Sequence, residues 1–274
     1  MAWQRLGAGI AVSRPLDELR AAYARTDLFA LDLDECIFPR ISQETLGRRI
    51  AHRLLCRPAR AADRRLFVRM LVGGTYRAFT KAKRLVGHAT PAARLIAWYE
   101  WTMRGVPEHY LAGAARTLPA RSHAFAAETI ALLAQHAPTG LATLGLDVVA
   151  RAFVEQFAGL TFFEANALLF QPGPRGERVV AGYDRSRLLA NGEAKRRSVE
   201  RRLADTGARV PSTIGHNEDD VPLARLAQEC GGLAIGFNPS PAHLDAFDAI
   251  ATGPDWEAMY ALVTILEGLG HRGG

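Results

Sequence analysis

Cysteine is scarce in this sequence: only three cysteines occur among 274 residues. They are Cys36, Cys56 and Cys230, and their spacing matches neither a disulfide framework nor a cysteine-based metal cluster. A chain of this size without a disulfide framework is typical of a reducing compartment. We therefore expect a reduced, cytoplasmic protein.

Long apolar runs are missing as well. No stretch of about eighteen apolar residues occurs, so we expect no membrane-spanning helix. The first residues, MAWQRLGAGIAV, lack a basic segment followed by a long apolar run, so we expect no secretory signal peptide. Aromatic residues make up only 8% of the chain, but hydrophobic residues make up 49%, which is enough for a core in one large domain or in a domain with a sizeable insert.

Acidic residues are nearly absent from residues 48–84, where Asp63 is the only one. The basic residues there are Arg48, Arg49, Arg53, Arg57, Arg60, Arg64, Arg65, Arg69, Arg77, Lys81, Lys83 and Arg84. With a formal net charge of +6, the chain favours an anionic partner. Three interpretations of the basic stretch stay open: a solvated helix face, steering of an anionic substrate, or contact with an anionic membrane. No nucleic-acid-binding motif is recognisable, so we expect no nucleic acid partner.

The spacing of apolar residues divides the chain into parts of different character. Residues 15–26 have the pattern of an amphipathic helix, and residues 28–31 form a short apolar run typical of a buried parallel strand. From about residue 42 to 118, apolar residues recur only at helical spacing. Helical segments then alternate with predicted strands at 140–146, 160–183, 210–216 and 232–237. This alternation predicts an α/β fold with a doubly wound parallel sheet.

Two carboxylates, Asp32 and Asp34, follow the first predicted strand. In an open α/β sheet, ligands collect at the carboxyl ends of the strands. Carboxylates this close repel each other unless a cation lies beside them, and Mg²⁺ prefers carboxylate and carbonyl oxygens. By itself, however, the D-x-D pattern is also typical of solvated loop acids or of a helix cap.

Further motifs follow in a fixed order. Thr143 ends the predicted strand in LATLG, Lys195 lies at the start of the helix in NGEAKRRSVE, and STIGHNEDDVPLARLA joins a strand to a helix through an acidic cluster. Together with FALDLDECIFP, these segments resemble the four motifs of the haloacid dehalogenase (HAD) superfamily, and in particular its phosphoserine phosphatase-like branch. The resemblance implies a Rossmann-like core formed by residues 1–40 and 119–274, with an all-helical cap inserted at residues 41–118.

The resemblance also implies a role for each matched residue. Asp32 would attack phosphorus to form an aspartyl-phosphate, and Asp34 would protonate the leaving oxygen and then deprotonate the hydrolytic water. Thr143 would donate its hydroxyl to a phosphoryl oxygen, and Lys195 would neutralise charge. Taken alone, Thr143 is typical of a threonine at the end of a strand, and Lys195 is typical of a surface cation. The expected function is hydrolysis of a small phosphate monoester; the alternatives are a catalytically silent binding protein and a phosphotransferase that uses the same intermediate.

His216 departs from the pattern of the superfamily. It occupies the position of an aspartate that usually binds the metal, whereas Asp220 keeps the second acidic position. We expect a divalent metal held by the Asp32 carboxylate, the Asp34 main-chain carbonyl and Asp220. Because imidazole suits softer ions than Mg²⁺, three explanations stay open. An acid of the 217–220 cluster binds Mg²⁺ instead, or His216 recruits Mn²⁺, or the metal site is impaired and the protein is silent.

Two smaller departures lie beside the paired carboxylates. Glu35 replaces a frequent glycine, and Cys36 stands where the superfamily usually has threonine or valine. We expect Cys36 to act simply as a small buried residue.

Overall fold

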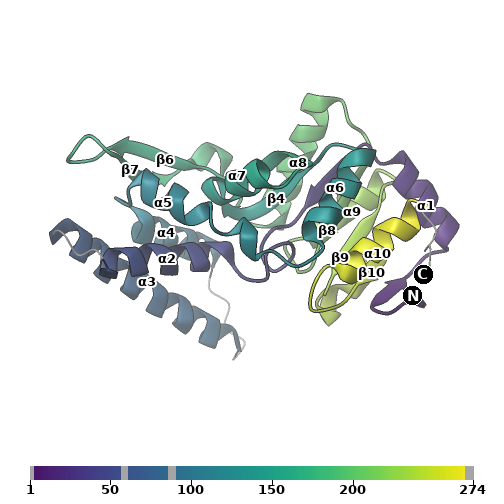
Figure 1. Cartoon of the computed structure of the whole chain (residues 1–274), viewed down its shortest axis with the longest axis horizontal. Coiled ribbons are helices and arrows are strands. Elements are labelled where there is room, and N and C mark those ends of the chain that lie inside the picture. The colour runs from purple at the N-terminus through teal and green to yellow at the C-terminus, as the bar shows by residue number, and fades with distance from the viewer. Residues whose placement is uncertain (1–2, 57–60, 86–90, 269–274) are drawn as a thin grey trace.

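Eight strands form one sheet in the computed structural model, which describes residues 3–56, 61–85 and 91–268 (Figure 1). The strand order is β1-β2-β10-β9-β8-β3-β4-β5. Pairing from β10 to β5 is parallel, whereas β1 and β2 add an antiparallel edge. The strands are β1 (Gln4–Gly7), β2 (Ile10–Val12), β3 (Leu28–Leu31), β4 (Thr139–Leu146), β5 (Leu160–Asn166), β8 (Pro211–Gly215), β9 (Ala234–Phe237) and β10 (Ala249–Ala251). The predicted doubly wound, mostly parallel sheet is confirmed.

Helices cover both faces of this sheet (Figure 1). They are α1 (Leu16–Arg25), α6 (Ala126–His136), α7 (Asp147–Gln156), α8 (Gly192–Thr206), α9 (Val221–Glu229) and α10 (Glu257–Leu266). Strand β3 shows how the sequence achieves this, because its side chains alternate between the two faces. Leu28 and Ala30 pack in a cluster with residues of α8 and α9, whereas Phe29 and Leu31 belong to the main core, where Phe29 contacts Tyr23 of α1. A strand that helices cover on both faces therefore has an apolar residue at every position.

Four of the helices that lie between β3 and β4 in the described chain occupy one end of the molecule (Figure 1). They are α2 (Ser42–Cys56), α3 (Ala61–Leu85), α4 (Ala92–Met103) and α5 (Glu108–Ala115). We propose that residues 41–118, which contain these helices, act as a cap on the core. A hairpin of β6 (Leu168–Pro172) and β7 (Arg178–Tyr183) packs against α4 and α5. The amide of Gly105, which lies between these two helices, donates to the Val180 carbonyl of β7 at 2.8 Å. Among the described residues, no helix has both the length and the apolar character needed to cross a membrane.

Three short strands escaped the sequence analysis: β1, β2 and β10. Strand β2 pairs with both β1 and β10, so it ties the beginning of the chain to its last strand. Each of the three has only three or four residues, which is too short for an alternating pattern to stand out. They extend the edge of the sheet that lies away from β3 and β4.

Candidate functional site

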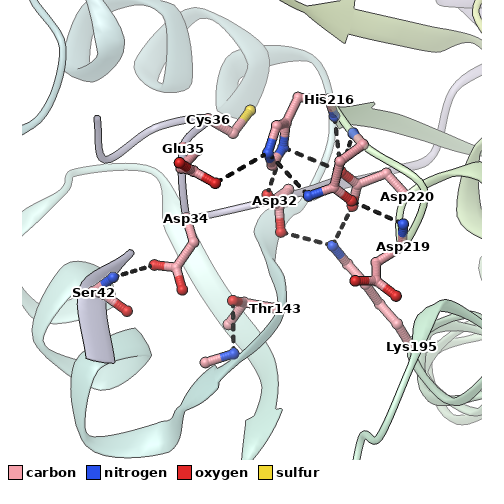
Figure 2. A network of polar contacts seen from close by, with 12 residues as sticks. Asp32, Asp34, Glu35, Cys36, Ser42, Thr143, Lys195, His216, Asp219 and Asp220 are labelled. Carbon is pink, nitrogen blue, oxygen red and sulfur yellow. Dashed lines mark hydrogen bonds and ion pairs between the residues drawn. The ribbon is translucent and has the colours of Figure 1, made fainter. Parts of the chain in front are cut away.

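The residues singled out by the motifs converge at one edge of the sheet. Asp32 follows β3 and His216 follows β8. Thr143 lies within β4, which continues to Leu146, so the prediction that Thr143 ends its strand is wrong. These strands are neighbours and run parallel, so their carboxyl ends lie together at the place where open α/β sheets bind ligands, which we call the crevice. Lys195, from the first turn of α8, reaches into the same region, as Figure 2 shows. The structure therefore brings together residues that lie far apart in the sequence.

Lys195 links two carboxylates. Its Nζ atom lies 2.7 Å from Oδ1 of Asp32 and 2.5 Å from Oδ1 of Asp220, and the residue is only 1% exposed. A buried ammonium group is stable only when it is paired. Burial alone would lower the pKa of Lys195, but the two carboxylates outweigh burial and hold that pKa above its usual range. Lys195 is thus a permanent charge in the crevice and not a surface cation.

Asp220 is fixed from several sides. Its Oδ2 accepts the backbone N–H groups of His216 at 2.7 Å and of Asn217 at 3.2 Å, while its Oδ1 faces Lys195. Burial would raise the pKa of Asp220, but Lys195 and His216 hold it below its usual range. A Cβ atom at Gly215 would lie 2.5 Å from the Asp220 Cβ, so the end of β8 has room for this side chain only because it is glycine. Asp220 precedes α9 but makes no side-chain cap hydrogen bond, so it serves the cluster and does not cap the helix.

His216 faces the remaining oxygens of both carboxylates. Its Nδ1 atom lies 3.2 Å from Oδ2 of Asp32 and 3.3 Å from Oδ2 of Asp220. Neither contact has the angles of a hydrogen bond. Among the described residues, this buried nitrogen therefore has no hydrogen-bond partner. One donor atom from each of the three residues lies within 4.8 Å of the others. An unpartnered imidazole nitrogen between two carboxylates is a donor set that fits a divalent metal ion.

The same carboxylates favour the charged form of His216. Burial would lower the pKa of the imidazole, but Asp220 and Asp32 raise it to about 10. A metal ion bound to this nitrogen must therefore displace a proton, and the two cations compete for one place. Among the described residues, neither Glu218, which is exposed, nor Asp219 belongs to this three-residue group.

Asp34 stands apart from this group. Its carboxylate points away from His216, and Oδ1 accepts the backbone N–H of Ser42 at 2.9 Å (Figure 2). Ser42 is the first residue of α2, so the helical segment fixes the side chain of Asp34. Burial raises the pKa of Asp34 to about 7, the Ser42 bond opposes that rise, and the charge of Asp32 adds to it. Among the described residues, the Asp34 side chain does not belong to the group formed by Asp32, His216 and Asp220.

Two hydroxyl groups border the space beside Asp34. The Thr143 hydroxyl accepts the Gly145 amide at 3.0 Å, which leaves its own proton for another acceptor. The Ser42 hydroxyl is buried without a partner among the described residues. A Cβ atom at Gly145 would lie 3.1 Å from Thr143 Oγ1, 3.5 Å from Ser42 Oγ and 3.7 Å from Asp34 Oδ2. Sequence reasoning missed Ser42 and Gly145; the only signal was a serine at the start of a predicted helix.

Glu35 and Cys36, the two departures from the motif pattern beside Asp34, differ in their structural consequences. Glu35 has φ of +59°, a left-handed conformation that costs a non-glycine residue on the order of 1 kcal/mol and that glycine adopts without this cost. Its carboxylate lies 4.0 Å from Nε2 of His216. Cys36 is fully buried, as expected, and its carbonyl accepts the Trp256 indole N–H at 2.9 Å.

The basic stretch is only partly described. Arg64 and Arg65 are exposed on α3. Arg69 instead donates to the Arg104 carbonyl and lies 5.9 Å from the Trp101 ring centre, so it holds α3 against α4. The residues of the stretch whose side chains lie outside the described part are Arg57, Arg60, Arg77, Lys81, Lys83 and Arg84.

Solved structures share this fold. A probable phosphoserine phosphatase from Vibrio cholerae is 14% identical, with 92% of this chain and 67% of that chain covered and a TM-score of 0.62. A HAD family hydrolase from Salmonella enterica serovar Typhi is 12% identical, with coverage of 88% and 71% and a TM-score of 0.61. A cytosolic 5′-nucleotidase IIIB bound to cytidine is 13% identical, with coverage of 96% and 95% and a TM-score of 0.59. No protein-family model and no curated protein matches the sequence. The chain therefore has the fold of HAD hydrolases.

Proposed function

We propose that this chain, built on the fold of these phosphatases, hydrolyses phosphate monoesters through an aspartyl-phosphate on Asp32. The observation that supports this most is the division of the crevice into two parts. On one side Lys195 joins Asp32 to Asp220, and on the other Asp34 lies beside Thr143, held by Ser42. Phosphoryl transfer requires mainly positioning and charge stabilisation around a nucleophile and a proton donor. Asp32 is the proposed nucleophile and Asp34 the proposed proton donor. Lys195 and Thr143 would supply the charge stabilisation and the positioning.

In the first step, an oxygen of the Asp32 carboxylate attacks phosphorus and the bond from phosphorus to the ester oxygen breaks. Asp34 gives its proton to that leaving oxygen, which departs as an alcohol. In the second step, Asp34 takes a proton from water, whose oxygen attacks phosphorus and releases Asp32 and inorganic phosphate. Lys195 offsets the charge on Asp32 throughout, and Thr143 donates its free hydroxyl proton to a phosphoryl oxygen.

Asp32 and Asp220 would hold the divalent metal, together with the Asp34 carbonyl, and His216 is a further candidate ligand. When bound, the ion supplies positive charge against the phosphoryl oxygens. We propose Mg²⁺ with low affinity, and Mn²⁺ as the better ion if His216 is a ligand, because imidazole nitrogen suits Mn²⁺ better than Mg²⁺. We further propose a small phosphorylated substrate and a cytoplasmic location, the latter because the cysteines match no disulfide framework.

The proposal is tested with purified protein and p-nitrophenyl phosphate, with Mg²⁺ and Mn²⁺ supplied separately. Asp32→Asn should abolish turnover and leave thermal unfolding unchanged, because an amide is nearly isosteric but a poor nucleophile. Asp205→Asn, an exposed acid on α8, is the matched control and should keep full activity. Turnover that survives in Asp32→Asn would refute the assignment of the nucleophile.

The same assay separates the alternatives. A protein that binds metal but never turns over any aryl phosphate is the silent binding protein that His216 makes conceivable. Release of p-nitrophenol that rises with added alcohol, faster than release of inorganic phosphate, would identify a phosphotransferase that intercepts the same intermediate.

A further inference from the structure

A second concave region, far richer in positive charge, lies between α2, α5 and the short 3-10 helix Pro119–Arg121. It has a volume of about 510 Å³, within the range of small-molecule sites. Its lining includes five arginines, which are Arg40, Arg48, Arg49, Arg53 and Arg121, together with His52. None of the residues assigned above to catalysis or metal binding belongs to it. We call it the arginine pocket.

Most of the charge in the arginine pocket is uncompensated. Arg48 pairs with Glu44 at 3.4 Å, one turn away on α2. Within the described parts of the chain, no ion pair joins a carboxylate to the remaining arginines, which are Arg40, Arg49, Arg53 and Arg121. Like charges gathered in a concavity with low-dielectric walls focus the field and attract counter-ions of opposite sign. The pocket therefore has an electrostatic preference for a multiply charged anion.

One of these arginines, Arg53, is held in place from behind. The Arg53 guanidinium lies 4.3 Å from the centre of the Tyr110 ring, and a Cβ atom at Gly113 would lie 3.5 Å from one of its terminal nitrogens. Arg49 is half-buried, and burial together with the nearby charge of Arg121 lowers the pKa of its guanidinium. Because a side chain that is ordered before a ligand arrives loses less entropy on binding, Arg53 is preorganised.

We propose that the arginine pocket binds a small anion that carries two or more phosphate groups. The planar guanidinium fork matches phosphate oxygens in bidentate geometry, and several forks in one pocket match several phosphates. Such a ligand would join the core to the cap, because Arg40 and Arg121 flank the helical segment while Arg49 and Arg53 lie on α2. The proposal goes beyond the proposed phosphatase activity and does not depend on it.

Inorganic pyrophosphate serves as the probe, titrated calorimetrically in the absence of divalent metal into protein carrying Asp32→Asn, so that no turnover occurs. Adding Arg49→Gln and Arg121→Gln together should weaken binding at least about tenfold, since hydrogen bonds to charged groups contribute roughly 1.5–3 kcal/mol each. The matched control, Arg5→Gln with Arg209→Gln, removes the same charge from exposed positions elsewhere and should change the dissociation constant less than about twofold. Thermal unfolding without probe checks that both double variants are folded.

Two outcomes would overturn the proposal. Absence of pyrophosphate binding to the protein with the intact pocket overturns it, and so does an equal loss in the pocket variant and the control, which would indicate general attraction by net charge. Sedimentation with vesicles that contain phosphatidylinositol 4,5-bisphosphate, whose headgroup carries several phosphate groups, distinguishes the source of the phosphates. Vesicle binding that is lost only in the pocket variant would identify a lipid headgroup as the ligand, and binding of pyrophosphate alone a soluble one.

Discussion

Asp32 and Asp34 are the same amino acid two positions apart, yet their surroundings differ completely. Asp32 faces the Lys195 ammonium and the His216 ring, whereas Asp34 is turned towards the start of α2 and accepts a single backbone N–H. Two carboxylates in such different surroundings are suited to different tasks, one as a charged nucleophile and the other as a group that gains and loses a proton.

The first prediction concerns the proton on Asp34. Since burial raises the pKa of Asp34 to about 7, its protonated form predominates below that pH and is lost as the pH rises through it. The first chemical step needs the protonated acid, so its rate should fall above about pH 7. Single-turnover kinetics with a poor leaving group measure this directly. Asp34→Asn should slow both steps by on the order of a hundredfold and remove that fall; an unchanged pH profile in this variant would assign the titration to another group.

A second prediction concerns His216. Because the imidazole nitrogen competes with a metal ion for the same two carboxylates, Mg²⁺ affinity should be low. His216→Asp replaces this nitrogen with a carboxylate oxygen and should raise Mg²⁺ affinity by about tenfold or more while reducing any preference for Mn²⁺. Calorimetric titration of both proteins with each ion measures the effect without any substrate. His243→Asp, which changes the same residue type on the short 3-10 helix Pro241–Ala246, is the control and should leave both affinities unchanged.

At the scale of elements, the site depends on how closely β4 approaches the start of α2. Gln43 of α2 donates to the Leu144 carbonyl at 3.3 Å, and Gly145 lies beside the Thr143 and Ser42 hydroxyls. A side chain at position 145 would therefore press on groups that the proposed reaction requires.

The third prediction is that Gly145→Ala lowers kcat. Its added methyl would lie 3.1 Å from Thr143 Oγ1, so the hydroxyl, which is fully buried, must shift by tenths of an ångström. Because small displacements of reacting groups carry large kinetic costs, we expect a loss of about tenfold in kcat with little change in thermal stability. Gly47→Ala, on α2 with open space around it, is the matched control. Equal activity of the two variants would show that Thr143 does not need its present position.

The sequence predicted the elements of the core well and the local contacts poorly. The buried strand 28–31 and the helical spacing from residue 42 onward carry strong periodic signals, and both correspond to real elements. The direction of the Ser42 amide towards Asp34 depends on tertiary geometry, and the spacing of apolar residues in the sequence carries no information about it. The order of the motifs located Lys195, but only the structure shows that this lysine is buried between two carboxylates.

For the whole molecule, charge is distributed unevenly. The formal net charge is +6, and many of the basic residues lie in the helical segment at one end of the molecule. If the proposed phosphatase activity is correct, a positive region on the helical segment would raise the rate at which anionic substrates arrive. Val68 and Leu71, which are 56% and 51% exposed, lie on α3 near Arg64 and Arg65, so contact of this face with a membrane is the competing interpretation.

The last prediction separates these interpretations. Arg64→Glu with Arg65→Glu reverses charge at two exposed positions, whereas Arg69 is left intact because it holds α3 to α4. If the face steers substrate, kcat/KM should fall severalfold at low ionic strength while kcat stays nearly constant, and most of the loss should disappear at about 0.5 M salt, where screening is strong. Arg5→Glu with Arg209→Glu makes the same change in net charge at exposed positions on β1 and before β8, and should lower kcat/KM much less. A loss that is equal at low and high salt contradicts steering, and the variant should then be compared with the unaltered protein for binding to anionic vesicles.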